Sequence, residues 1–172
     1  MGIGKIGPVM QFAFVPKDFD AAVRHWTETM GVGPFYLLEN NVLGEGLYLG
    51  EPYHCVFSIA IAYWGDIQIE LVRQENDAPS IYKGAEGEAL HHTCILTGDI
   101  KAARKIAADA GASVLVEGKV GADGYVLYVD TGGGPGTIVE ILQMASGSEG
   151  LFGMIKAASV DWDGSEPLRK LG

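Results

Sequence analysis

The sequence has few cysteines, few basic side chains and no long apolar run. Its two cysteines, Cys55 and Cys94, are too few for a disulfide framework, and neither lies in a Cys-x-x-Cys motif. Lys and Arg number 12 against 22 Asp and Glu, and the resulting formal charge of −10 argues against a nucleic-acid partner. No apolar stretch approaches the roughly 20 residues that cross a bilayer, and the first residues lack the build of a signal peptide. We therefore expect a cytoplasmic protein that binds neither nucleic acid nor a membrane.

The chain repeats one order of secondary-structure elements. With 172 residues, of which 48% are hydrophobic, it fits one compact domain or two small modules that share a core. In each half, a strand leads through an Asp N-cap into a helix that stops at a glycine, and further strands follow. The expected elements are strand 11–18, helix 19–30, strands 35–39, 55–63 and 66–73, with a weaker strand pattern at 47–49, then strand 92–99, helix 100–110 and strands 113–117, 124–129 and 137–143.

This repeat predicts an α+β fold of two tandem βαβββ modules. Neither half is long enough to bury its sheet alone, so the two must share one core. We expect a first module at 7–74, a polar connector at 75–90, a second module at 91–144 and a C-terminal tail at 145–172. The tail is expected to contain one short helix, around 151–158, whose Phe152, Met154 and Ile155 pack on the body.

Two glutamates lie in strands that are otherwise apolar. Side chains alternate between the two faces of a strand. In the strand at 66–73, Glu70 points away from an apolar face, whereas Glu140 shares its face with Ile138 and Leu142. A carboxylate with such neighbours is costly to bury unless a positive group pairs with it.

Two further polar residues occupy the matching first strands of the two halves. Gln11 and His92 each share a strand face with apolar residues, and they pair across the repeat as Glu70 and Glu140 do. Two carboxylates, an imidazole nitrogen and an amide oxygen that meet at one point are suitable ligands for a divalent metal. The sequence therefore predicts one such ion, bound by Gln11, Glu70, His92 and Glu140, with Zn, Ni, Co, Mn and Fe all open.

At these motifs the sequence resembles the vicinal oxygen chelate superfamily, which includes glyoxalase I, methylmalonyl-CoA epimerase, extradiol dioxygenases and bleomycin resistance proteins. The resemblance covers residues 7–144. The motifs that carry it are QFAFVPKDFDAA at 11–22, IQIEL at 67–71, HHTCILTGDI at 91–100, YVDT at 128–131 and TIVEIL at 137–142.

The resemblance implies that the two modules curl into a cupped, half-barrel mixed sheet with the helices outside and the metal inside. Its ligand positions fall on Gln11, Glu70, His92 and Glu140. This set is similar to that of glyoxalase I and methylmalonyl-CoA epimerase. An extradiol dioxygenase would have histidine where Gln11 stands, so that activity is a minor alternative.

The implied activity is that of a metal-dependent lyase or isomerase, which removes a proton next to a carbonyl through a metal-bound enediolate or enolate. Glu140 is expected to be the catalytic base, with Glu70 as the second choice. Aromatic side chains are expected in or beside the cup and favour a bulky apolar or aromatic substrate, while the few Lys and Arg argue against a glutathione or CoA conjugate. Those aromatic residues are Trp26, Phe35, Tyr48, Tyr53, Tyr63, Trp64, Tyr125 and Tyr128, and most of them are expected to belong to the ordinary core.

Some alternatives stay open at this point. A non-catalytic protein that binds a small molecule, as resistance proteins of the family do, is the main competing interpretation. The family also suggests a homodimer, in which the site forms either within one chain or between two. His91 precedes His92, and because strand neighbours point to opposite faces, only His92 is expected to join the site.

Overall fold

The computed structural model of the chain describes residues 1–87 and 89–171. The strands are β1 (Val9–Phe14), β2 (Phe35–Asn41), β3 (Gly44–Tyr48), β4 (Glu51–Pro52), β5 (Phe57–Trp64), β6 (Ile67–Gln74), β7 (His92–Leu96), β8 (Ser113–Val120), β9 (Gly124–Asp130), β10 (Ile138–Gln143) and β11 (Leu168–Lys170). The helices are α1 (Phe19–Arg24), α2 (Ile100–Asp109) and α3 (Ser148–Ser159), with a π-helical turn at His25–Thr29 and a 3₁₀ turn at Ile3–Lys5. None of these helices, which belong to the described residues only, is long and apolar enough to span a membrane.

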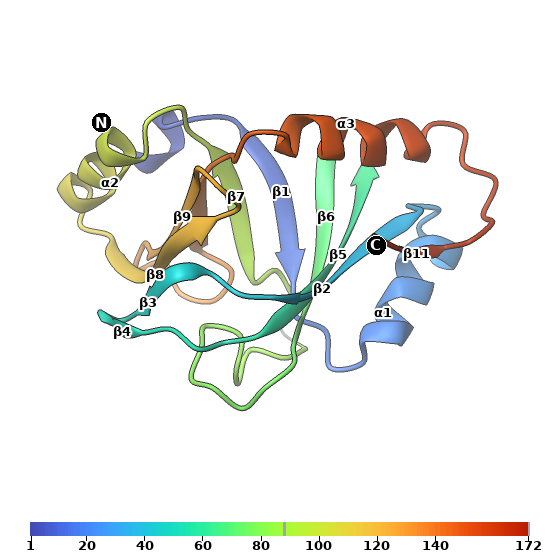
Figure 1. The fold of residues 1–172 in the computed structure, drawn as a ribbon, viewed down its shortest axis with the longest axis horizontal. Helices are drawn as coiled ribbons and strands as arrows, with labels where there is room; N and C mark the ends of the chain where they lie inside the picture. The colour runs from blue at the N-terminus through green and yellow to red at the C-terminus, as the bar shows by residue number, and fades with distance from the viewer. Residues whose placement is uncertain (88, 172) are drawn as a thin grey trace.

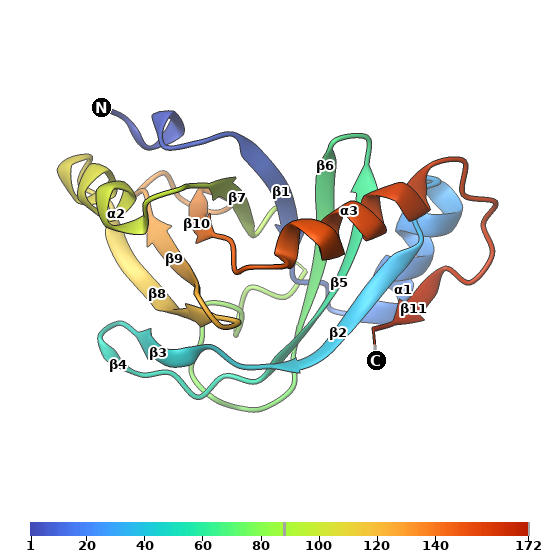
Figure 2. The same ribbon diagram turned by 45° about the horizontal axis from the view of Figure 1, so that its top comes forward.

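All strands join one mixed sheet in the order β11-β2-β5-β6-β1-β7-β10-β9-β8-β3-β4. In each module the first strand lies parallel to the last, β1 to β6 and β7 to β10. The modules meet where β1 pairs antiparallel with β7. Figures 1 and 2 show the strongly curved, open sheet, with α1 and α2 at opposite ends. The predicted α+β fold of two βαβββ modules is therefore confirmed.

The two module helices begin at the caps that the sequence predicts. The Asp18 carboxylate accepts a hydrogen bond from the backbone N–H of Ala21 at 2.8 Å. Asp99 accepts hydrogen bonds from the N–H groups of Lys101 and Ala102, both at 3.0 Å. These caps satisfy N–H groups that the first turn of a helix leaves without a partner.

Helices α1 and α2 cover the outer face of the sheet. Phe19 and Val23 of the first-module helical segment pack with Ile69 and Leu71 of β6. In the second module, α2 packs in the same way against β9 and β10. Because the side chains of β6 alternate, Glu70 is left on the inner face.

The chain departs from the expected pattern between β2 and β5. After β2 it crosses to the far edge of the sheet, where β3 pairs antiparallel with β8 of the second module. The short hairpin of β3 and β4 therefore extends the second module, although its residues come from the first. The residues between β2 and β5 carry only local turn signals, and these do not indicate which distant strand the hairpin pairs with.

The C-terminal tail is more structured than the sequence indicates. Its helix α3 lies on the inner face of the sheet, where fully buried Ile155 packs with Tyr36, Ile61 and Tyr63. Met154, which was expected to pack on the body, is 41% exposed because neighbouring helix residues point about 100° apart. After α3, the tail adds β11 parallel to β2 at the edge of the sheet.

Candidate metal centre

The four polar residues predicted to share a site lie on four neighbouring strands at the middle of the sheet. Gln11 is on β1, Glu70 on β6, His92 on β7 and Glu140 on β10, and these strands are adjacent in the order β6-β1-β7-β10. Ala13 of β1 pairs with Glu70 on one side and with His92 on the other. The four polar side chains are buried, with exposed fractions between 0% and 7%. The structure thus brings all four together on the inner face.

The imidazole of His92 faces both carboxylates. Its Nε2 atom lies 3.1 Å from Oε2 of Glu140 and 3.8 Å from Oε1 of Glu70. Around one ion with bonds of 2.0–2.2 Å, neighbouring donor atoms lie about 3.0–3.5 Å apart. The distance from Nε2 of His92 to Glu140 falls in this range, whereas the distance to Glu70 is slightly longer.

The amide of Gln11 has a buried oxygen without a partner. Its Nε2 donates to Oε1 of Gln68 at 2.9 Å and to Oε2 of Glu70 at 3.0 Å. Gln68 in turn donates from its own Nε2 to the hydroxyl of Tyr63 at 3.0 Å. This network leaves Oε1 of Gln11 buried and unpaired. An unpaired buried acceptor is costly, and a cation would satisfy it.

Burial shifts the protonation of the site. It raises the pKa of Glu70 to about 7, and the charge of Glu140 acts in the same direction. Burial also raises the pKa of Glu140 to about 7, although a hydrogen bond with Tyr128 opposes this. It lowers the pKa of His92 to about 4. Near neutral pH the metal-free site therefore holds a neutral imidazole and partly protonated carboxyls, and a divalent cation would favour the ionised carboxylates.

Within residues 1–87 and 89–171, no group of three or more His, Cys, Asp and Glu side chains is arranged as a ready-made metal site. Nε2 of His92 and Oε2 of Glu140 are within hydrogen-bonding distance of each other, so a cation binding here would replace that contact. The residue types nevertheless fit a divalent metal, since they supply two carboxylates, one neutral imidazole and one unpaired amide oxygen.

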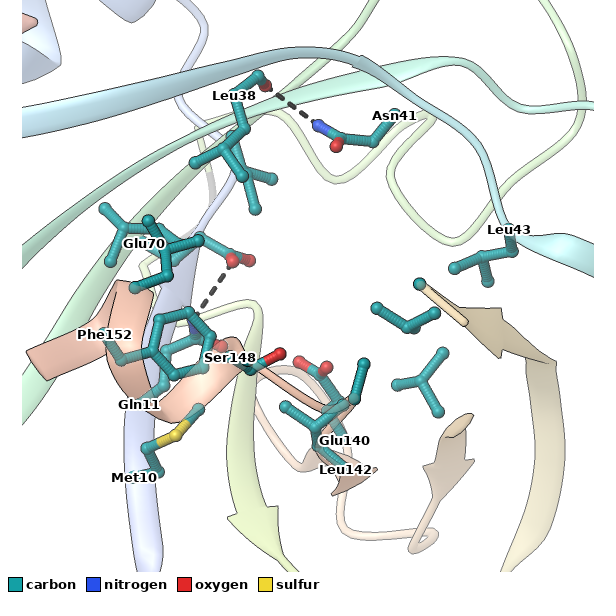
Figure 3. Close-up of a pocket in the computed structure, with 18 of the residues that line it drawn as sticks. Met10, Gln11, Leu38, Asn41, Leu43, Glu70, Glu140, Leu142, Ser148 and Phe152 are labelled. Carbon is teal, nitrogen blue, oxygen red and sulfur yellow. Dashed lines mark hydrogen bonds between the residues drawn. The ribbon is translucent and has the colours of Figure 1, made fainter. Parts of the chain in front are cut away.

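The site opens into a cavity of about 560 Å³. Figure 3 shows Gln11, Glu70 and Glu140 pointing into it, with Phe152 of α3 beside them. Most of its wall is apolar, including Phe57 of β5. Among the described residues that line it, none is Lys, Arg or His. The cavity thus combines two acidic groups with walls that suit an uncharged, apolar molecule.

Of the aromatic residues named from the sequence, most of which were expected in the ordinary core, only Tyr128 lines the cavity. Phe35 packs in the cluster beneath α1, and Trp64 is 56% exposed. The aromatic residues that do line it with Tyr128 are Phe57 and Phe152. Which aromatic residues line the cavity depends on the strand face that each occupies and on where the C-terminal tail packs. Residue type alone does not determine it.

The sequence interpretation also missed residues that support the site. Gln68 had a detectable signal, because it is two residues from Glu70 and shares its strand face. Phe152 had none, since the tail pattern does not show which face of the sheet α3 covers. His91 lies one residue before β7, so strand alternation does not fix its direction, and its ring contacts His92.

Solved structures with a similar fold include several methylmalonyl-CoA epimerases. An epimerase variant from Streptomyces coelicolor, in complex with 2-nitronate-propionyl-CoA, is 17% identical, with a TM-score of 0.59 over 82% of this chain and 96% of that one. The epimerase from Mycobacterium tuberculosis is 13% identical, with a TM-score of 0.56 over 84% and 91%. A hypothetical protein from Bacillus halodurans is 15% identical, with a TM-score of 0.57 over 81% and 96%. At these identities the likeness shows a common fold.

A comparison with curated proteins finds no match. A comparison with protein families matches residues 10–128, which is more than half of the chain and includes β1 to β8 and most of β9. The chain therefore belongs to the glyoxalase/bleomycin resistance protein/dioxygenase superfamily.

Proposed function

We propose that this protein is a metal-dependent lyase or isomerase that removes a proton from a carbon next to a carbonyl group. The observation that carries the proposal is that Gln11, Glu70 and Glu140 line one apolar cavity, with buried His92 in contact with both carboxylates and the amide oxygen of Gln11 buried and unpaired. Such a set binds a divalent cation, and the cavity gives an organic molecule access to it.

The residues proposed to hold the cation are Gln11 through Oε1, His92 through Nε2, and the carboxylates of Glu70 and Glu140. When bound, a divalent cation supplies positive charge that polarises a carbonyl and stabilises the negative charge developing on its oxygen. Gln68 and Tyr63 hold the Gln11 amide so that its oxygen remains available.

Glu140 is proposed as the base that accepts the proton. Its carboxylate lines the cavity, where it can reach a proton on a bound molecule. Glu70 also lines the cavity, which makes it the second candidate. Glu140 and Glu70 lie on β10 and β6, with β1 and β7 between them, so they reach a bound molecule from different sides.

The proposed substrate is an uncharged, bulky, apolar or aromatic molecule. The S. coelicolor epimerase binds a CoA ligand, which carries phosphates. Here the described lining residues supply no Lys or Arg to pair with such a group, and Leu38, Leu43 and Phe152 contribute apolar surface instead. A volume of about 560 Å³ fits a drug-sized molecule.

The same apolar wall favours one second candidate, a protein that binds a hydrophobic molecule without reacting with it. The two functions differ in the need for a cation. A binder would retain its ligand after chelation of all metal, whereas the proposed enzyme would lose turnover.

The proposal can be tested with purified protein loaded with Zn²⁺, Co²⁺, Ni²⁺, Mn²⁺ or Fe²⁺ and with (R)-benzoin in D₂O as an uncharged aromatic probe. We expect one bound ion per chain by elemental analysis, and deuterium exchange with racemisation at the benzoin carbinol carbon by NMR and chiral chromatography.

Glu140→Gln should retain the fold and lose most of the exchange, while Glu28→Gln, on the exposed π-helical turn, serves as the matched control. Full exchange in metal-loaded Glu140→Gln would remove Glu140 from its role. Benzoin binding without metal or exchange would favour the non-catalytic binder.

A further inference from the structure

A second histidine lies directly behind the candidate metal ligand His92. His91 is 3% exposed and does not line the 560 Å³ cavity. Its Nδ1 lies 2.8 Å from Nδ1 of His92, and its Nε2 lies 2.8 Å from the backbone carbonyl oxygen of Ile81. The proposed function assigns no role to this pair of contacts.

The Ile81 carbonyl determines the direction of both hydrogen bonds. A carbonyl oxygen only accepts, so Nε2 of His91 is the donor in that contact. Because His91 is 3% exposed, burial favours its neutral form, in which Nδ1 carries a lone pair and accepts. Nδ1 of His92 must therefore carry a hydrogen and donate it to His91.

The direction of this hydrogen bond also determines whether Nε2 of His92 carries a proton. A neutral imidazole has one N–H, and that of His92 is already used toward His91. Its Nε2 lone pair therefore faces the carboxylates of Glu140 and Glu70 at 3.1 and 3.8 Å. A nitrogen lone pair directed at two carboxyl groups is the form that a metal ligand needs, and the opposite tautomer would point an N–H at them instead.

We propose that His91 is a positioning residue that holds His92 in the tautomer with Nδ1 protonated and Nε2 free to bind a metal. The role rests on the proposed metal centre, but the tautomer itself is a property of the metal-free protein. The connector between the modules takes part in this role, because it provides the Ile81 carbonyl that accepts the hydrogen bond from His91.

The connector is built to keep this carbonyl in place. The Ser80 hydroxyl donates to Oε1 of Gln74 at 2.6 Å and accepts from the backbone N–H groups of Tyr82 and Lys83 at 3.0 and 3.1 Å. These bonds fix the turn that includes Ile81.

The rings are also held from their sides. The Tyr82 ring packs on His91 at a centroid distance of 5.5 Å, and the Tyr128 ring packs edge-on against His92 at 5.2 Å. Both imidazoles are thus held in position by packing as well as by hydrogen bonds.

The first test measures the tautomer without any metal. Chelator-treated protein labelled with ¹⁵N-histidine is examined by long-range ¹H–¹⁵N NMR. We expect the His92 proton on Nδ1 in the wild type. In His91→Phe, which keeps a ring but removes the acceptor, we expect it to move to Nε2, where Glu140 accepts it. His91→Asn, whose side-chain oxygen can take the place of Nδ1, should restore the wild-type tautomer.

The second test measures binding of Zn²⁺ and Co²⁺ alone by calorimetry. We expect His91→Phe to bind about 10- to 100-fold more weakly, as is usual when the outer partner of a metal-ligating histidine is lost, and His91→Asn to bind nearly as the wild type does. Thr27→Val is the matched control, because it removes another buried hydrogen bond, from Thr27 to the carbonyl of Val23, far from the site.

Each outcome separates the two proposals. A wild-type His92 protonated at Nε2 would overturn the role of His91, as would a His91→Phe protein with unchanged tautomer and affinity. Wild-type protein with the expected tautomer that binds none of the metals would instead contradict the proposed function and leave the positioning role supported. If His91→Phe does not fold, the wild-type spectrum and His91→Asn still decide the question.

Discussion

Replacing Glu140 by glutamine should make the metal-free fold less sensitive to pH. Glu140 and Glu70 are 7% and 6% exposed, and burial raises both pKa values from 4.5 to about 7. A carboxyl with a higher pKa in the folded than in the unfolded chain binds extra protons when folded. Its stabilising contribution is complete below pH 4.5 and is lost as the pH rises through 7.

Linkage converts these pKa values into a free energy of unfolding. Between pH 6 and 8, each carboxyl loses on the order of 1 kcal/mol of stabilisation. His92, whose pKa falls from 6.5 to about 4, regains part of this over the same interval, because the unfolded chain loses the imidazole proton that the folded chain does not hold. The metal-free wild type should therefore lose about 1 to 2 kcal/mol, and Glu140→Gln clearly less, since it keeps only one buried carboxyl, which also loses its charged neighbour.

Urea unfolding of chelator-treated protein at pH 6, 7 and 8, followed by circular dichroism, measures this difference. Glu28→Gln, which changes an exposed carboxyl, should retain the wild-type slope against pH. Adding Zn²⁺ should raise the wild-type midpoint most at pH 8, where the carboxylates are ionised. A wild-type stability that does not fall from pH 6 to 8, or a Glu140→Gln slope equal to that of the wild type, would refute the reasoning.

Four further changes test other parts of the structure. The affinity for Zn²⁺ should rise from pH 6 to 8, because binding releases protons from the two buried carboxyls, and calorimetry in buffers of different ionisation enthalpy counts them. Gln68→Leu should weaken Zn²⁺ binding about 10-fold in the same assay, because the Gln11 amide loses the acceptor that orients it. Phe152→Ala should raise KM for benzoin several-fold with a smaller effect on kcat, in steady-state racemisation assays, because it removes apolar wall but no group that binds the cation or accepts the proton. Asp99→Ala should lower the free energy of unfolding by about 1 kcal/mol in urea titrations, through loss of the α2 cap.

The local patterns of the sequence were sufficient for most of the fold. Alternation along β6 and β10 put Glu70 and Glu140 on the inner face, and the caps at Asp18 and Asp99 placed the start of both helices. These features depend on neighbours within a few residues, so they are readable without the tertiary structure. The repeat of one element order then indicated that the two halves contribute matching ligands.

Long-range placement could not be predicted in the same way. The pairing of β3 with β8, the position of α3 on the inner face and the β11 edge strand all join segments far apart in the chain. The energy that selects these pairings comes from burial against surfaces that exist only after folding. For that reason the cavity wall came out differently from the aromatic lining expected from composition.

The sequence by itself determined which residues face inward and that two carboxylates, an amide and an imidazole share that face. Only the tertiary structure decided how their atoms meet, because orientation depends on partners outside each strand. The oxygen of Gln11 is left free by Gln68, and the lone pair of His92 is directed by His91 and the Ile81 carbonyl. Strand alternation fixes the side of the sheet on which a side chain lies, whereas the direction of its hydrogen bonds follows from the donors and acceptors that folding brings beside it.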